Sequence, residues 1–149
     1  MTNRPSGPPG PPRPPGPPPP DVFAGFSEFG QALGQFMAGR SNVRGAILTD
    51  NRGDPVDFAH RPDKLSALDV QIAGAQVEAV ASRVQEWSDR HGLGACEILV
   101  EASHGLLLFG VPGRECVLTS LHDHAAYADP LGQLAAFAAL RRQIATLFT

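Results

Sequence analysis

The segment from Ser66 to His91 constrains the fold of this chain most strongly. It contains no proline, and its apolar residues recur every three or four positions, which predicts one long helix. Ser66 followed by Asp69 is a capping signal for its start, and Gly92 follows its last turn. We expect a broad apolar stripe of this helix to rest on a sheet of the same chain. The stripe contains Val70, Ala73, Val77, Val80, Val84, Trp87 and His91.

The same helix carries a second, narrower apolar stripe. Its members are Leu68, Ile72, Ala75 and Ala79. A helix that lies on a single sheet needs only one apolar stripe, so we interpret the second as a surface for another helix. The alternative is that the alanines, which are good helix formers, simply face water. Leu68 and Ile72 argue against full exposure.

Composition predicts one domain preceded by a tail. Of the 149 residues, positions 1–20 form a Pro/Gly-rich tail that we expect to be disordered, and positions 21–149 form a single domain. The tail is either a solubilising tether, which we favour, or a ligand for a proline-binding module. No apolar run is long enough to span a membrane, and no signal peptide or basic patch for nucleic acid is evident. Two cysteines suit a cytoplasmic location.

A second amphipathic segment runs from Asp21 to Met37 and is predicted to be a Phe-rich helix within positions 21–40. Its apolar residues at helical spacing are Phe23, Phe26, Phe29, Leu33 and Phe36. Three glycines lower its helix propensity, so it needs a surface on which to dock. It is either a docked core helix, which we favour, or a helix that leaves the domain to bind a partner.

The remaining segments alternate short apolar runs with turn signals. Val43–Thr49 is predicted to be a central strand, because it is apolar on both faces apart from Arg44. Further strands are expected at residues 54–59, 96–102, 106–111 and 115–121, and a last helix begins after Asp129-Pro130. The order α-β-β-α-β-β-β-α predicts an α+β fold. We expect an antiparallel five-stranded sheet between helices, an α/β/α sandwich.

This order of elements resembles the roadblock (dynein light chain) family, of the type that regulates small GTPases in bacteria. Three segments carry the resemblance: residues 43–53 with their Asp-x-x-Gly turn, the long Ala-rich helix, and the closing helix at residues 131–144. Together they cover about Asn42 to Phe148. Residues 5–20 and the Phe-rich segment lie outside it.

The resemblance implies that the chain is a regulator or scaffold and forms homo- or heterodimers through the long helix and the third strand. The interface would then contain Leu68, Ile72, Ala75, Ala79, Ile98 and Val100. One feature of the third strand fits poorly. In an antiparallel self-pair centred on Leu99, Glu97 would lie opposite Glu101, which is destabilising. Either the register is shifted, the partner strand belongs to another chain, or the glutamates protect an unpaired edge.

Motifs for catalysis are not evident in the sequence. Lys64, the only lysine, has no glycine-rich run before it, so the chain has no phosphate-binding loop. His122-Asp123-His124 is a weak metal signal, and exposed loop histidines are the expected alternative. Cys96 and Cys116 are expected two strands apart, beyond disulfide reach. We therefore predict no enzyme activity, no cofactor and no metal.

Two functions remain open. The first is a dimeric regulator or scaffold for a small Ras-like GTPase, which would contact the polar end of the long helix at Arg83, Glu86 and Arg90. The second is a structural adaptor, which dimerises and recruits other partners through the Pro-rich tail or the Phe-rich segment.

Overall fold

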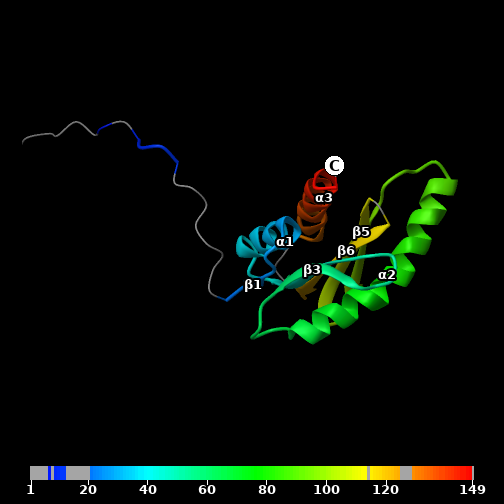
Figure 1. The fold of residues 1–149 in the computed structure, drawn as a ribbon, viewed down its shortest axis with the longest axis horizontal. Helices are drawn as coiled ribbons and strands as arrows, with labels where there is room; N and C mark the ends of the chain where they lie inside the picture. The colour runs from blue at the N-terminus through cyan, green and yellow to red at the C-terminus, as the bar shows by residue number, and fades with distance from the viewer. Residues whose placement is uncertain (1–6, 8, 13–20, 114, 125–128, 149) are drawn as a thin grey trace, which may run out of the picture.

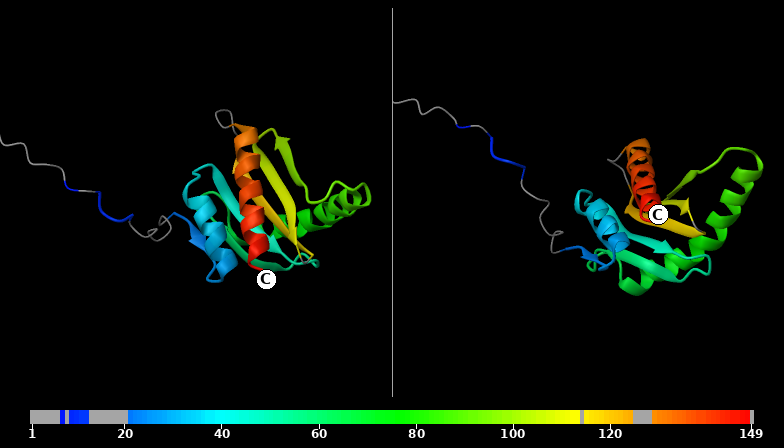
Figure 2. Two further views of the ribbon diagram at one scale, coloured as in Figure 1. Left: turned by 90° about the horizontal axis from the view of Figure 1, so that it is seen from above. Right: turned by 45° about the horizontal axis from the view of Figure 1, so that its top comes forward.

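A computed structural model describes residues 7, 9–12, 21–113, 115–124 and 129–148. The domain is a three-layer sandwich, with one sheet between α1 and α3 on one face and α2 on the other (Figures 1 and 2). Its elements in chain order are β1 (Phe23–Ala24), α1 (Glu28–Ala38), β2 (Val43–Thr49), β3 (Pro55–His60), α2 (Ala67–Arg90), β4 (Glu97–Ala102), β5 (Gly105–Gly113), β6 (Cys116–Asp123) and α3 (Pro130–Thr146). Most of the predicted disordered tail lies outside the described residues.

The sheet is antiparallel, and its strand order is β1-β3-β2-β6-β5-β4. β2 is central, as its apolar sequence predicted, and the long β2–β6 pairing joins the two halves of the sheet. The prediction of five strands is wrong, because a sixth strand, β1, pairs with β3 through Phe23–His60 and Ala24–Ala59. β3 is therefore covered along part of the edge that the five-strand prediction left open.

A buried arginine holds the chain just before β1. The Arg61 side chain is 4 % exposed, and it donates hydrogen bonds to three main-chain carbonyls and forms an ion pair with Asp21. The carbonyls belong to Val43 (3.0 Å), Met37 (2.8 Å) and Arg40 (3.1 Å). These bonds satisfy a guanidinium that would be costly to bury alone. They also tie the start of β1 to the core.

The predicted Phe-rich helix begins later than its periodicity indicated. Residues up to Ala24 form β1, and α1 begins at Glu28 after the N-cap Ser27, whose hydroxyl accepts a hydrogen bond from the Gly30 amide. A Cβ at Gly25 would overlap the Asp57 carboxylate, so the chain passes β3 too closely for a side chain. Phe23 therefore lies in a strand and Phe26 in a loop. The rest of the segment is a docked core helix, as favoured from the sequence.

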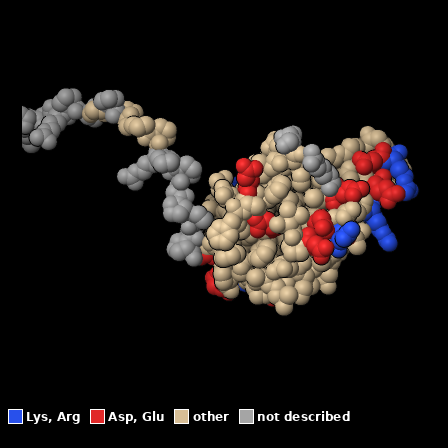
Figure 3. All heavy atoms as spheres, viewed as in Figure 1, with Lys and Arg blue, Asp and Glu red and all other residues tan. Residues whose placement is uncertain are grey.

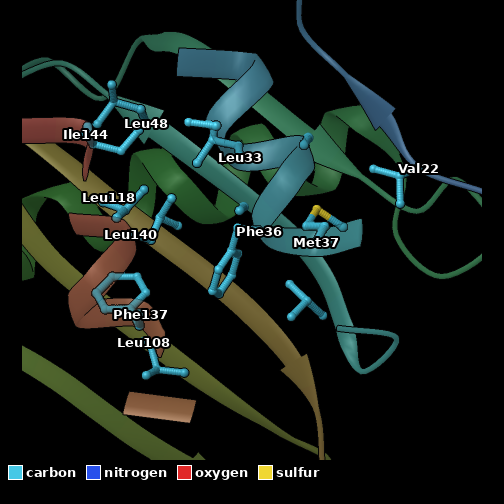
Figure 4. Close-up of a cluster of buried hydrophobic side chains, with 14 of the residues drawn as sticks. Val22, Leu33, Phe36, Met37, Leu48, Leu108, Leu118, Phe137, Leu140 and Ile144 are labelled. Carbon is cyan, nitrogen blue, oxygen red and sulfur yellow. The ribbon is translucent and has the colours of Figure 1, made fainter. Parts of the chain in front are cut away.

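The main core lies between the sheet and the helices α1 and α3. In Figure 4, side chains from α1, from α3 and from the strands meet in one cluster. Its members include Leu33, Phe36, Met37, Leu48, Leu108, Leu118, Phe137, Leu140 and Ile144. The capping prediction for α3 is confirmed, because Asp129 accepts a hydrogen bond from the Leu131 amide and Pro130 begins the helix. Within the described residues, no helix is both long and apolar enough to cross a membrane.

Candidate functional surface on α2 and β4

α2 is the 24-residue helix that the sequence predicted, with Ser66 as its N-cap and Gly92 in a left-handed conformation after it. Such a helix is about 36 Å long. It packs on β2, β3, β5 and β6, while β4 packs against α3 on the opposite face of the sheet. This placement leaves the outer side of α2 and the edge of the sheet open next to one another.

The side of α2 that faces the sheet differs from the predicted broad stripe. Val70 is buried as predicted, but the other buried positions are small or polar residues: Gly74, Ala81 and Ser88. A Cβ at Gly74 would come within 2.9 Å of Ile47 and Thr49, so the helix approaches the sheet too closely for larger side chains. This close approach rotates the helix away from the orientation that periodicity alone predicted.

As a result, three members of the predicted inward stripe lie on the outside. Val80 is 53 % exposed and Trp87 is 54 % exposed, and His91 stacks on Trp87 with ring centroids 4.5 Å apart. Sequence reasoning missed Val80 and Trp87 as surface residues, because their spacing also fits an inward stripe. An exposed tryptophan is a frequent anchor in protein interfaces. It is the signal that could have identified this side of the helix.

All four members of the predicted second stripe are exposed. Leu68 is 65 % exposed, and Ile72, 45 % exposed, lies on the same side of the helix as Val80. Ala75 and Ala79 are exposed too, but Ala75 lies beside Gly53 in the β2–β3 turn, where a close helix would be hindered. The open apolar stripe of α2 is therefore formed mainly by Leu68, Ile72, Val80 and Trp87.

The edge strand β4 continues this apolar surface. Ile98 pairs with Phe109 and Val100 with Leu107, and these residues share the α2 face of the sheet. Ile98 is half-buried against Phe109, whereas Val100 is 42 % exposed. We call the stripe of α2 together with Ile98 and Val100 the α2–β4 surface. The structure brings these predicted interface residues to one side of the domain.

The two glutamates of β4 point to the other face, where each meets a base of its own chain. Glu97 accepts a hydrogen bond from Arg141 of α3 at 2.5 Å, and both side chains are mostly buried. Glu101 lies 3.6 Å from His124, an ion pair when the imidazole is protonated. The repulsion that the sequence predicts between Glu97 and Glu101 of two paired β4 strands is therefore reduced, because Arg141 neutralises Glu97.

The three predicted partner-binding residues lie at the exposed end of α2. Glu86 forms an ion pair with Arg90 one turn later, and Arg83 is exposed between Val80 and Trp87. Figure 3 shows acidic and basic side chains next to one another where α2 ends. This end of the helix is strongly charged, whereas the stripe before it is apolar.

A groove of about 520 Å³ lies between the polar side of α2 and the strands β5 and β6. Four acidic residues line it together with Cys116: Glu78, Glu86, Asp89 and Glu115. Burial raises the pKa of the Cys116 thiol, and the charges of Asp50 and Glu115 raise it further. The thiol therefore stays protonated at neutral pH and is a poor nucleophile. Cys116 and Cys96 are both free.

The sequence His122-Asp123-His124 does not form a shared site. His122 is buried, contrary to the expectation of an exposed loop histidine, and its Nε2 lies 2.7 Å from the Ser120 hydroxyl. Burial lowers the pKa of His122 to about 4. Asp123 instead binds Arg44 and Lys64, each at 2.6 Å. In the part of the chain that the structure describes, no three His, Cys, Asp or Glu side chains are grouped to hold a metal ion.

Solved structures of bacterial proteins share this architecture. The chain superimposes on a Roadblock/LC7 domain from Streptomyces avermitilis with a TM-score of 0.64, 18 % identity, and coverage of 80 % of this chain and 97 % of that one. The chain has the roadblock fold. The resemblance stated from sequence motifs is thereby confirmed at the level of the fold.

Two further roadblock-fold structures are similar. MglB from Myxococcus xanthus gives a TM-score of 0.65 at 14 % identity, covering 83 % of this chain and 96 % of that one. A structure described as MglB with tetrameric arrangement gives 0.64 at 16 % identity, covering 83 % and 92 %. No family model and no curated protein sequence matches the chain.

Proposed function

We propose that this protein is a non-enzymatic, dimeric regulator or scaffold for a small Ras-like GTPase. The single observation that carries the proposal is the open α2–β4 surface, in which an apolar helical stripe lies beside an unpaired strand edge. Exposed apolar surface of this extent favours a protein partner. The roadblock fold supports a GTPase as that partner, because many bacterial members of the family act on one.

A second copy of the chain fits this surface. If two α2 helices lie antiparallel with Ile72 opposite Trp87 of the partner subunit, Leu68 comes opposite His91 and Val80 opposite Ala79 by the same spacing. Apolar residues then meet at Ile72 and Val80, and the exposed indole packs on Ile72. The neighbouring MglB structure with tetrameric arrangement supports an oligomeric state.

Negative charges introduced into the stripe test the dimer. We expect Ile72→Glu with Val80→Glu to give monomers, because both carboxylates would be buried in the pairing. Leu131→Glu, at a residue 75 % exposed on α3, is the matched control and should leave the mass unchanged. Light scattering across a concentration series measures this. A double variant with the wild-type mass, or a monomeric wild type, would refute the α2–β4 dimer.

The GTPase would contact the charged end of α2. Glu86 and Arg90 are suited to the test, because they neutralise one another and their joint removal leaves no unpaired charge. Arg83 lies between Val80 and Trp87, so its removal would affect the dimer as well. We expect Glu86→Ala with Arg90→Ala to weaken GTPase binding while the dimer persists.

The binding measurement uses a small Ras-like GTPase loaded with GDP or with a GTP analogue. A regulator should distinguish the two states, since only a ligand that discriminates between states can shift them. Equal affinity for both would instead leave the structural adaptor, which dimerises and recruits other partners through the Pro-rich tail or the exposed phenylalanines.

A further inference from the structure

The β1 edge of the sheet carries aromatic side chains that the proposed regulation does not use. The Phe23 side chain is 47 % exposed, and its ring centroid lies 6.3 Å from that of Phe58 and 5.6 Å from that of His60. Phe26, in the loop directly after β1, is 93 % exposed. We call these four residues the β1 aromatic cluster. Phe23 and Phe26 expose their rings, while the half-buried Phe58 and the buried His60 support the Phe23 ring from beside it. The two exposed rings favour a ligand that packs on ring faces.

The backbone at this edge offers little to an added strand. β1 has only two residues, and β3 begins with Pro55, which has no N–H to donate. A ligand that docks here must be recognised mainly by its side chains and should not need main-chain partners. A polyproline II segment meets both conditions, because proline has no N–H, its carbonyls stay hydrated, and its rings pack on aromatic side chains.

The chain supplies such a segment directly before the cluster. Eleven of its 15 prolines lie in residues 5–20, which join the domain at Asp21. We propose that the Pro-rich segment of one copy docks on the β1 aromatic cluster of a second copy. The association links copies through a surface separate from the α2–β4 surface.

The geometry at the junction favours a second copy over the tail's own domain. Asp21 is held by Arg61, Val22 is buried, and Phe23 is paired in the sheet, so the direction in which the chain enters β1 is set. A Pro-rich segment is stiff and extends about 3.1 Å per residue, so residues 5–20 can span about 50 Å. Such a segment reaches a neighbouring molecule more readily than it folds back onto Phe23 of its own chain.

The test is a titration of the ¹⁵N-labelled full chain with a synthetic peptide of residues 5–20, followed by NMR. We expect the amides of Phe23, Phe26 and Phe58 to shift. Phe23→Ser with Phe26→Ser should weaken the apparent affinity about tenfold or more, because two ring contacts are lost. Leu131→Ser, at an exposed apolar residue on α3, is the control and should bind as the wild type. Phe26→Ser alone serves if the double variant does not fold.

Two results would overturn the proposal. One is the absence of shifts at the β1 aromatic cluster at millimolar peptide, or the same affinity in the Phe26→Ser variant. The other comes from a dilution series of the full chain without peptide. The cluster amides should move with protein concentration, and constant positions together with shifts on deletion of residues 1–20 would mean that the tail docks on its own domain.

Discussion

The two edges of the sheet expose different chemistry. At one edge, β4 offers six residues of backbone, an apolar face with Ile98 and Val100, and glutamates that meet bases of their own chain. At the other, β1 offers two residues and the exposed ring of Phe23, which lies beside Phe58 and the buried His60. A long edge with balanced charge can add another strand, whereas a short edge that continues into proline cannot. One sheet thus carries one edge suited to strand pairing and one suited to side-chain contact.

The largest expected effect is at the β1 edge. Arg61→Ala should lower the free energy of unfolding by about 3–5 kcal/mol, because it removes a buried guanidinium that bonds three main-chain carbonyls and pairs with Asp21. Hydrogen exchange at Phe23 should also rise towards that of an unpaired segment. Urea unfolding measures the first effect. Arg44→Ala, at a residue whose side chain is 38 % exposed, is the control and should cost about 1 kcal/mol or less. Equal losses would mean that Arg61 does not anchor this edge.

The next largest expected effect is at the centre of the sheet, where a buried histidine makes stability depend on pH. Burial lowers the pKa of His122 on β6 from 6.5 to about 4, so the folded state keeps the imidazole neutral while the unfolded chain takes up a proton. The contribution to stability is fully present above pH 6.5 and is lost as the pH falls towards 4. It amounts to at most about 3 kcal/mol. Urea unfolding at pH 7, 5.5 and 4 should show a steeper loss in the wild type than in His122→Gln. Parallel curves would contradict this.

A smaller effect is expected at the β4 edge. Arg141→Met should cost about 2 kcal/mol, because it leaves the mostly buried Glu97 without its counter-charge, and it should also weaken the dimer if that edge pairs. Arg142→Met on the same helix is exposed and should change neither quantity. Unfolding and sedimentation of both variants provide the comparison. A dimer that is unaffected by Arg141→Met would argue that β4 stays unpaired and that α2 alone forms the contact.

The smallest effect concerns the tail. Residues 1–20 are mainly proline and glycine, so we expect their deletion to leave the melting temperature of a dilute sample nearly unchanged. The deletion should, however, reduce association at high concentration, since it removes the proposed ligand of the β1 aromatic cluster. Calorimetry on dilute samples tests the first expectation. A large drop in melting temperature would place the tail in the folded core.

Much of the fold could be predicted from local signals. Ser66 and Asp129 mark the starts of α2 and α3, because a side-chain oxygen at an N-cap bonds amides only a few residues away. The turn after β2 is equally local, since Asp50 accepts from the amides of Arg52 and Asp54 and Gly53 takes a positive φ of 82°. β2 was recognisable as central because both of its faces are apolar.

Part of the candidate surface was predictable for the same reason. Leu68 and Ile72 are apolar at positions that a single amphipathic helical pattern does not account for, and both are exposed. Val100, also exposed, was expected there only through the family resemblance. The rotation of α2 was not predictable, since Val80 and Trp87 fit an inward stripe equally well. Gly74 at the contact with Ile47 decides the rotation, and that contact exists only once the helix lies on the sheet.

The sequence by itself determined the helices, the turns and the central strand, because each depends on residues close together along the chain. Tertiary structure alone decided β1, which is too short to show a period and forms only by pairing with β3. It also decided the charge balance of the β4 edge, where Glu97 meets Arg141 from 44 residues away. Contacts between such distant residues depend on how the layers pack, and no local pattern records that packing.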